Sequence, residues 1–335
     1  MKSSKYNFTL ELDDGAMLLY NCASGAIVKI PEKDYEKYFN HSDDILSEDV
    51  DCDIKRENIA GLKKGHFIVD DDFDELNYIK ALHNKERYSP GIYQLGIVPS
   101  GKCNFACSYC FYKDHDGGNM SPEVEKRLLE TVGAAFKNRK KLNVTWTGGE
   151  PTLAADTIIR LSKGFIDIAK SNNAVYASCI LTNGYLLDRE MASDFAKCGI
   201  QLAQIALDGP AEVHNARRPL KNGGGTFDVI LNNIREISDL INVILRINLD
   251  RNNAQEEYIE RILDQVEEAG VPKKVFIDIQ QVVPYTLACS NYVETNGIRH
   301  CSNYADVLTE FIPLVTARGY NFMFNGKFLM PALSA

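Results

Sequence analysis

The sequence predicts an α/β fold: a partial (β/α)6 parallel barrel preceded by a small winged-helix-like α+β domain. Two observations lead to this fold class. From residue 91 onward, apolar runs rich in Val, Ile and Leu alternate with helical stretches, as parallel strands and their crossover helices do. Before residue 89 the order is instead three short strands, helices and a closing strand. Six strand–helix repeats fall short of the eight in a closed barrel, so we expect an open curved sheet, with a doubly wound sheet as the alternative.

The N-terminal domain is predicted over residues 1–88. Alternating apolar and polar residues, separated by Gly-containing turns, predict its strands at 8–12, 17–20 and 26–30. The other expected elements, before the boundary Ser89-Pro90-Gly91, are helices at 32–39, about 57–62 and about 74–86 and a strand at 66–69. Residues 1–90 hold 12 Lys and Arg against 19 Asp and Glu, whereas the rest of the chain holds 25 against 27. This difference predicts a separate acidic module, and a solvated acidic surface is the alternative.

The barrel domain is predicted over residues 89–319. Its strands are expected at 93–99, 142–147, 175–182, 201–207, 242–249 and 275–283, and its helices at about 121–139, 154–171, 188–198, 226–240, 255–269 and 302–318. Residues 320–335 predict one more strand over 320–324 and the start of a C-terminal extension, which is either cut short or dispensed with.

Composition and charge exclude several classes of protein. The chain has 335 residues, of which 45% are apolar and 25% charged, as in an ordinary globular protein. It contains no run of about 18 apolar residues and no apolar segment at its N-terminus, so we expect neither a transmembrane helix nor a secretory signal. The net charge of -9 argues against nonspecific nucleic-acid binding. We therefore expect a cytoplasmic protein with no membrane or nucleic-acid partner.

Nine cysteines are the strongest chemical signal, because an odd number without a secretory signal indicates reduced thiols and a metal site rather than a disulfide framework. Cys103, Cys107 and Cys110 fall within eight residues, directly after the first predicted barrel strand. Thiolates suit an iron–sulfur cluster or zinc. Three of them would leave one iron of a four-iron cluster open for chemistry, whereas His115 could complete a zinc site.

The spacing Cys103-x3-Cys107-x2-Cys110, with the aromatic Tyr109, resembles the signature of the radical S-adenosylmethionine enzymes. The resemblance implies that the three cysteines bind a 4Fe-4S cluster whose free iron chelates the amino and carboxylate groups of S-adenosylmethionine. An electron from the cluster would cleave this cofactor to a 5′-deoxyadenosyl radical, which abstracts hydrogen from a substrate. Tyr109 is expected to contribute to adenine binding, through its backbone or its ring.

Further parts of the family's pattern follow in order. Gly148-Gly149-Glu150-Pro151 resembles the GGEP element, which implies contacts with the cofactor ammonium; a simple Gly-Gly turn before a helix is the alternative. Many relatives have Ser where this chain has Ala206. Arg246 is therefore the candidate for the cofactor carboxylate, and a salt bridge to an acidic loop is its alternative role. The remaining candidates for cofactor binding, expected near the carboxyl ends of strands, are Thr182, Asn183, Asp208 and Asn248.

The resemblance covers about residues 93–285 and is to the branch of the family that modifies peptides and proteins. Residues 1–88 resemble leader-peptide-recognition domains, although such a domain could serve only to pack on the barrel. The expected function is hydrogen abstraction from a ribosomally synthesised precursor peptide, followed by thioether or carbon–carbon cross-linking, with a reductant such as flavodoxin or ferredoxin. The alternatives are a sulfatase-maturase-like enzyme and a non-catalytic metal-binding interaction protein.

Relatives of this kind often carry a C-terminal extension, called SPASM or twitch, whose many cysteines bind auxiliary iron–sulfur clusters and are absent here. Cys289 and Cys301 lie in a polar stretch after the last barrel strand, so either is a candidate auxiliary ligand in a longer chain. The other cysteines are predicted to be inert buried or isolated thiols, namely Cys22, Cys52, Cys179 and Cys198.

Overall fold

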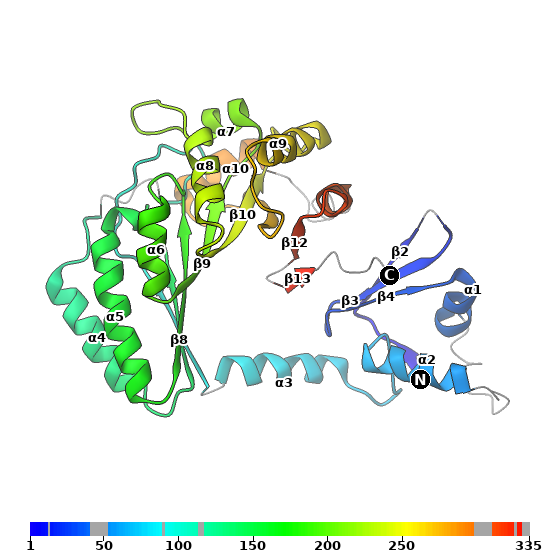
Figure 1. Ribbon diagram of the computed structural model, residues 1–335. Coiled ribbons are helices and arrows are strands. Elements are labelled where there is room, and N and C mark those ends of the chain that lie inside the picture. The colour runs from blue at the N-terminus through cyan, green and yellow to red at the C-terminus, as the bar shows by residue number, and fades with distance from the viewer. Residues whose placement is uncertain are drawn as a thin grey trace. The chain divides into compact units, whose positions relative to one another are not determined.

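The computed structural model describes residues 1–12, 14–40, 53–88, 91–112, 117–297, 310–324 and 327–329. The chain divides into two units, Met1–Ser89 and Pro90–Ala335 (Figure 1). The first unit is a small mixed structure of helices and antiparallel strands. The second unit is built on one long sheet.

The first unit contains a three-stranded antiparallel sheet of β2 (Asn7–Glu11), β3 (Met17–Asn21) and β4 (Ala26–Ile30), in that order. Its other elements are the paired strands β1 (Lys2–Ser3) and β5 (Ile68–Val69), the helices α1 (Glu32–Tyr35), α2 (Asp53–Lys64) and α3 (Glu75–Tyr88), and a π-helical turn at Glu36–Asn40. The expected strand at 66–69 is shorter, because His66 takes a positive φ of 58° at the end of α2.

One face of this small sheet is packed and the other is open. Leu19 and Ile30 lie in a core with Leu62 of α2 and Phe67. Residues on the opposite face are more exposed, and Phe8 is 64% exposed. Successive side chains of a strand point to opposite faces of the sheet, so only every second apolar residue of these strands reaches the core.

The second unit contains an eight-stranded sheet in the order β6-β7-β8-β9-β10-β11-β12-β13. Neighbouring strands from β6 to β12 are parallel, and β13 is antiparallel to β12. The strands are β6 (Ile92–Ile97), β7 (Lys141–Trp146), β8 (Val175–Thr182), β9 (Ile200–Ala206), β10 (Asn242–Leu249), β11 (Phe276–Gln281), β12 (Asn321–Phe324) and β13 (Lys327–Leu329). The predicted α/β class with an open, mostly parallel sheet is confirmed.

The connecting helices follow the predicted order. They are α4 (Pro122–Ala135), α5 (Ala155–Ser171), α6 (Arg189–Lys197), α8 (Phe227–Ile237) and α9 (Glu256–Glu268). Residues 310–317 are also helical, and residues 302–309 of the helix expected there lie outside the described residues. Three short helices were not predicted from the sequence: η2 (Pro151–Ala154), α7 (Ala211–Arg217) and α10 (Leu287–Asn296).

The strand expected at 320–324 has a different place from the one predicted. We expected it to begin a C-terminal extension, but β12 pairs with β11 as the seventh parallel strand of the sheet. Tyr320 and Phe322 are fully buried in the same core as the other strands. Burial of these two aromatic side chains explains why this segment closes the sheet.

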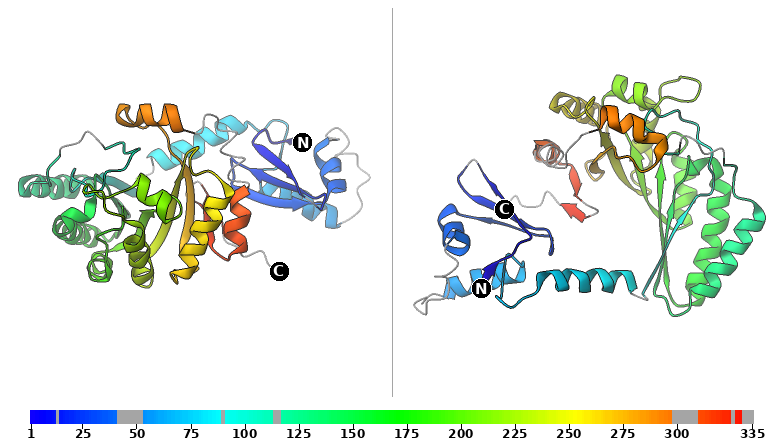
Figure 2. Two further views of the ribbon diagram at one scale, coloured as in Figure 1. Left: turned by 90° about the horizontal axis from the view of Figure 1, so that it is seen from above. Right: turned by 180° about the vertical axis from the view of Figure 1, so that it is seen from behind.

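Helices α4, α5, α6 and α8 run along one side of the strands (Figures 1 and 2). In β7, Leu142, Val144 and Trp146 are fully buried on the face that contacts α5, whereas Asn143 and Thr145 alternate onto the other face and are partly exposed. The helix-covered face is therefore apolar, and the opposite face carries polar side chains.

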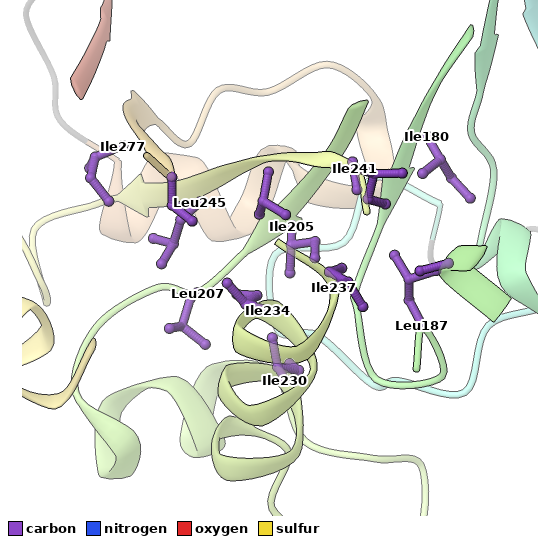
Figure 3. Packing of buried hydrophobic residues seen from close by; sticks show 14 of the residues in the cluster. Ile180, Leu187, Ile205, Leu207, Ile230, Ile234, Ile237, Ile241, Leu245 and Ile277 are labelled. Carbon is purple, nitrogen blue, oxygen red and sulfur yellow. The ribbon is translucent and has the colours of Figure 1, made fainter. Parts of the chain in front are cut away.

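Helix α8 shows how the helical layer is attached to the sheet. Ile230, Ile234 and Ile237 are fully buried and lie near Ile205 and Leu245 of the strands (Figure 3). Their spacing of three and four residues puts them on one side of the helix. The packed layer keeps the strands together, so that their carboxyl ends form a fixed edge.

We expect Ile234→Ala to lower the free energy of unfolding of the second unit by about 2–5 kcal/mol, because the change leaves a cavity in this layer. Val229→Ala on the same helix is the matched control, because Val229 is 40% exposed, and it should cost about 0.5 kcal/mol or less. Urea unfolding followed by fluorescence of the single tryptophan, Trp146, reports on this unit. Equal losses in the two variants would contradict the described packing.

Candidate active site

The three motif cysteines lie in residues 98–112, the loop that follows β6 (the cysteine loop). Cys103, Cys107 and Cys110 are free thiols and are all partly exposed. They line a single cavity of about 810 Å³ together with Gly101, Lys102, Asn104, Phe105, Ala106, Ser108, Tyr112, Gly117, Gly149, Leu153 and Lys221.

The surroundings of two of these thiols favour their protonated form. Burial raises the pKa of Cys107 to about 11, against the opposing effect of the Arg218 guanidinium, and burial raises the pKa of Cys103 as well. Both thiols are therefore protonated at neutral pH and would lose a proton on binding a metal, because thiolate is the ligating form.

The donor set fits an iron–sulfur cluster. Three soft sulfur atoms line one cavity, and three ligands leave one iron of a four-iron cluster open. In the described part of the chain, no three His, Cys, Asp or Glu side chains form a group that could hold a single metal ion. His115, the alternative zinc ligand, lies outside the described residues.

The Gly-Gly turn after β7 packs directly against the cysteine loop. A Cβ atom on Gly148, whose φ is +135°, would lie 2.5 Å from the carbonyl oxygen of Ser100, and one on Gly149 would lie 2.4 Å from that of Lys102. The N–H of Gly149 donates to the Ser100 carbonyl at 3.2 Å. Only glycine permits this approach, so the two residues fix the turn against the cysteine loop.

Glu150 is fully buried, and its carboxylate ties the end of β7 to the end of β8. It accepts hydrogen bonds from the hydroxyls of Thr152 and Thr182, both at 2.6 Å, and from the backbone N–H groups of Thr152 at 3.0 Å and Asn183 at 2.7 Å. The side chain is thus bonded within the protein, and the expected contact of the motif's backbone and of Glu150 with a cofactor ammonium stays a prediction. Pro151 is buried at the first position of η2.

Asn183 links Glu150 to the cysteine loop, because its backbone bonds to Glu150 and its side chain bonds to Asn104. Its Nδ2 donates to Oδ1 of Asn104 at 2.7 Å and lies 4.0 Å from Sγ of Cys103. The GGEP turn and the end of β8 therefore hold the part of the cysteine loop that bears Cys103.

A second buried carboxylate, Asp208, follows β9. It accepts a hydrogen bond from the Tyr109 hydroxyl and two from Asn248, through its backbone N–H at 3.2 Å and its Nδ2 at 2.9 Å. Nε of Arg217 lies 3.7 Å and Nη1 of Arg218 lies 3.9 Å from its Oδ2. Burial alone would raise the pKa of Asp208, but the Arg218 and Arg217 charges outweigh burial and hold it below its usual value. Asp208 is therefore ionised and acts only as an acceptor.

Tyr109 is enclosed by the same groups. Its hydroxyl accepts hydrogen bonds from Nη1 of Arg218 at 2.6 Å and from Nδ2 of Asn248 at 3.2 Å. The guanidinium carbon of Arg217 lies 5.1 Å from the ring centroid, which is within the range of a cation–π contact. The hydroxyl of Tyr109 thus points into the protein, and the contribution of this residue to adenine binding, through its backbone or its ring, stays a prediction.

His214 contacts the backbone of Asp208 and the hydroxyl of Thr226. The backbone N–H of Asp208 donates to Nδ1 of His214 at 3.1 Å, and Nε2 lies 3.1 Å from the Thr226 hydroxyl. Burial, with the Arg218 charge, lowers the pKa of His214 to about 3, so the ring is neutral at physiological pH. Because Nδ1 accepts, the proton lies on Nε2 and is donated to Thr226, whose hydroxyl donates to the Arg218 carbonyl at 2.8 Å.

No role was predicted for Arg217 and Arg218, or for Asp250 and Tyr292 beside them. Arg217 donates to Asp250 at 2.6 Å, and Asp250 also accepts from the Tyr292 hydroxyl at 2.5 Å. The sequence offered one indication of the arginines' position, because they closely follow the segment Asp208-Gly209-Pro210. Tyr292 could not be found in this way, because it lies on the unpredicted helix α10.

Arg246 lies in a different environment. Its Nε donates to Oδ2 of Asp278 at 2.7 Å, directly across from it on β11, and Asp278 is buried. The alternative partner expected for Arg246 was an acidic loop, and this detail is wrong because the carboxylate comes from a strand. A role of Arg246 toward the cofactor carboxylate stays a prediction.

Cys289 is buried in α10, where its Sγ lies 3.3 Å from the Thr286 carbonyl oxygen. Cys301 and Cys52 lie outside the described residues. Cys198 is buried and Cys179 is partly exposed, whereas Cys22 is exposed in the first unit.

The sequence matches a known protein family over the part of the chain that forms the sheet and the site. Residues 97–266, half of the chain, match the model of the Radical SAM superfamily, and the chain therefore belongs to this family. The family uses a 4Fe-4S cluster and S-adenosylmethionine. Within the described residues, none of the helices combines the length and the apolar character needed to span a bilayer.

Two curated proteins illustrate the similarity. The cysteine-type anaerobic sulfatase-maturating enzyme of Clostridium novyi is 32% identical over 141 residues, which cover 41% of this chain and 37% of the relative. The Fe-coproporphyrin III synthase of Methanosarcina barkeri is 29% identical over 179 residues, which cover 52% of this chain and 41% of the relative. The chain thus spans about two fifths of the length of these relatives.

Two solved structures share the fold. The structure of anSMEcpe with bound AdoMet has a TM-score of 0.51 and 20% identity, covering 68% of this chain and 59% of that chain. The structure of Streptococcus suis SuiB bound to S-adenosylmethionine has a TM-score of 0.51 and 14% identity, covering 97% of this chain and 72% of that chain.

We expect Gly149→Ala to remove most of the iron that the protein binds after anaerobic reconstitution, because the added methyl group would push the turn away from the Lys102 carbonyl. Gly118→Ala is the control, since a Cβ there meets nothing within 4 Å. Iron and sulfide are measured per chain after gel filtration. Wild-type iron content in Gly149→Ala would show that the close approach is dispensable.

Proposed function

We propose that this radical SAM enzyme is a peptide maturase that acts on a ribosomally synthesised precursor and forms a thioether or carbon–carbon cross-link. The observation that carries the proposal is the pairing, in one chain, of the cysteine-loop cavity with an N-terminal unit that presents a free strand edge beside an apolar groove. The similarity in fold to SuiB supports it, because its 97% coverage of this chain includes most of residues 1–89.

In this proposal Cys103, Cys107 and Cys110 hold the cluster. When bound, the cluster would supply the electron that cleaves S-adenosylmethionine to the 5′-deoxyadenosyl radical, which would take one hydrogen atom from the peptide. Closing the cross-link would release one proton and one further electron, and the electron would pass to an oxidised electron-transfer protein such as flavodoxin or ferredoxin. The backbone of Gly148-Gly149-Glu150 offers polar groups beside the cavity, to which we assign the cofactor ammonium. Thr182, Asn183, Asp208 and Asn248 order the loops around the cofactor, Tyr109 contributes to adenine binding, and Arg246 is the candidate for the carboxylate.

The leader segment of the precursor would bind to the edge of β4. Among the described strands of this sheet, β4 has only β3 as a hydrogen-bonded neighbour. A groove of about 530 Å³ lies along β4 and α2 and is lined by Val28, Ile30, Leu62 and Phe67 among others. An extended peptide could add to the sheet through its backbone and place alternate apolar side chains in this groove.

Gly61 of α2 is a position at which the groove can be tested. It lines the groove and is exposed, and a Cβ atom on it would meet nothing within 4 Å. Glycine inside a helix costs about 1 kcal/mol relative to alanine, so its presence is not explained by helix stability. A large side chain introduced at this position would compete with a bound peptide for space in the groove.

A second candidate function is modification of a folded protein substrate, as in a sulfatase-maturating enzyme. The sequence similarity to the Clostridium novyi enzyme favours it. The two candidates differ in their dependence on a leader segment. Turnover of a precursor that falls sharply when its N-terminal half is removed supports the peptide maturase, and undiminished turnover supports the second candidate.

We place the reaction in the cytoplasm, with flavodoxin or ferredoxin as the reductant. The seven cysteines that the structure describes are all free thiols, as a reducing compartment maintains them. A low-potential electron donor is needed because the cluster must be reduced before it can cleave the cofactor.

We expect Cys107→Ala to abolish cluster binding and formation of 5′-deoxyadenosine while the fold is retained, because one of three ligands is lost. Cys22→Ala, which changes an exposed thiol of the first unit, should behave as the wild type. The assay is anaerobic, with dithionite and S-adenosylmethionine, and iron is counted in the same samples. About four irons per chain indicate one cluster, whereas clearly more would indicate an auxiliary cluster that involves Cys289 or Cys301. Unchanged cleavage in Cys107→Ala would overturn the assignment of the site.

We expect Gly61→Phe to weaken binding of precursor peptide, because the ring would occupy the groove. Gly61→Ala is the control and should retain binding while it stabilises α2 by up to about 1 kcal/mol. The probes are full-length synthetic peptides encoded by short reading frames beside the gene, each also made without its N-terminal half, with fluorescence anisotropy as the readout. Equal affinity of the two variants for a peptide that the wild type binds would argue that the groove is not the docking site.

A further inference from the structure

We propose that Tyr109 is a positioning residue whose buried hydroxyl, held by Asp208 and Arg218, fixes the part of the cysteine loop that bears Cys107 and Cys110. The inference rests on the proposed function, because it assigns the hydroxyl a task toward the cluster that these cysteines would hold. It is separate from the expected role of the aromatic ring in adenine binding.

The hydroxyl of Tyr109 uses all of its hydrogen-bonding capacity inside the protein. It donates to Asp208, which is ionised and has no proton to give. It accepts from Arg218 and from Asn248 at 2.6 Å and 3.2 Å. One donor and two acceptor positions are what a hydroxyl group offers, so its orientation is fully determined.

The three partners come from three different parts of the fold. Asp208 follows β9, Asn248 lies in β10, and Arg218 follows α7. A side chain held at three such points cannot shift without breaking a charge-assisted hydrogen bond. The residue between Cys107 and Cys110 that carries this side chain is therefore fixed relative to the end of the sheet.

Backbone contacts restrain the same stretch of chain. The N–H of Ala106 donates to the Pro219 carbonyl at 2.9 Å, and the N–H of Ser108 donates to the Arg217 carbonyl at 3.0 Å. These two N–H groups flank Cys107. The segment that supplies the arginines thus holds Cys107 by its backbone on both sides, while Tyr109 is held by its side chain.

The hydroxyl also matters for Arg218. The Arg218 side chain is only 10% exposed. Among the described residues, its Nη1 donates a hydrogen bond to the Tyr109 hydroxyl. Asp208 lies at 3.9 Å from the same atom, which is too far for a good hydrogen bond. Phenylalanine at position 109 would keep the ring but leave a buried guanidinium poorly partnered, and such a group is costly.

The experiment compares wild type, Tyr109→Phe and Tyr176→Phe in the full chain after anaerobic reconstitution. Tyr176 is the matched control, because its hydroxyl bonds to Ser162 at 3.1 Å within the helix-covered core. Transfer of iron to a chelator is timed, and the electron paramagnetic resonance spectrum of the reduced cluster is recorded with and without S-adenosylmethionine. We expect Tyr109→Phe to lose iron about 10- to 100-fold faster than the wild type, a ratio that corresponds to the loss of one hydrogen bond to a charged group. We also expect the spectrum of its reduced cluster to be broader. Tyr176→Phe should match the wild type.

The outcomes separate the inference from the proposed function. A wild-type chain that binds no iron would overturn both. A wild-type chain that binds the cluster, with Tyr109→Phe equal to it in iron loss and in spectrum, would overturn the inference alone. If Tyr109→Phe does not fold, Asp208→Asn tests the same hydrogen bond from the other partner, and an unchanged rate and spectrum in that folded variant would also overturn the inference.

Discussion

The cysteine loop lies between β6 and α4 with no helix or long strand of its own, so its shape depends on two buried carboxylates. Glu150 joins the ends of β7 and β8 and, through Asn183, reaches the segment that bears Cys103. Asp208 holds Tyr109 between the other two cysteines. A buried carboxylate is stable only when hydrogen bonds or opposite charges surround it, so each one draws several parts of the chain to the site.

The parallel sheet makes this arrangement possible. Helices bury one face of the strands, as α8 does with Ile234, and hold the strands in a fixed order. The carboxyl ends of β7, β8, β9 and β10 therefore lie next to one another, and residues that follow them converge although they are far apart in sequence. Arg246 and Asp278 lie on neighbouring strands of the same sheet, where they form an ion pair.

The N-terminal unit follows a different principle. Among the strands that the structure describes, β2 and β4 are both edges of its sheet, and the groove lies beside β4 and α2. An exposed edge is normally a hazard for aggregation, and proteins retain one where a partner strand binds. The edge of β4 and the groove beside it agree with the proposal that a peptide is recognised here before it reaches the radical chemistry.

The sequence by itself determined the elements and residues that depend on near neighbours: the alternation of strands and helices, the three cysteines, and the Gly-Gly turn, whose tight approach needs residues without side chains. Only the tertiary structure decided which partners these residues meet. The contact of Tyr109 with Asp208 spans 99 residues and that of Arg246 with Asp278 spans 32, and both follow from strand order rather than from local pattern. The place of β12 as a seventh parallel strand was likewise decided by burial of Tyr320 and Phe322, which no local periodicity reveals.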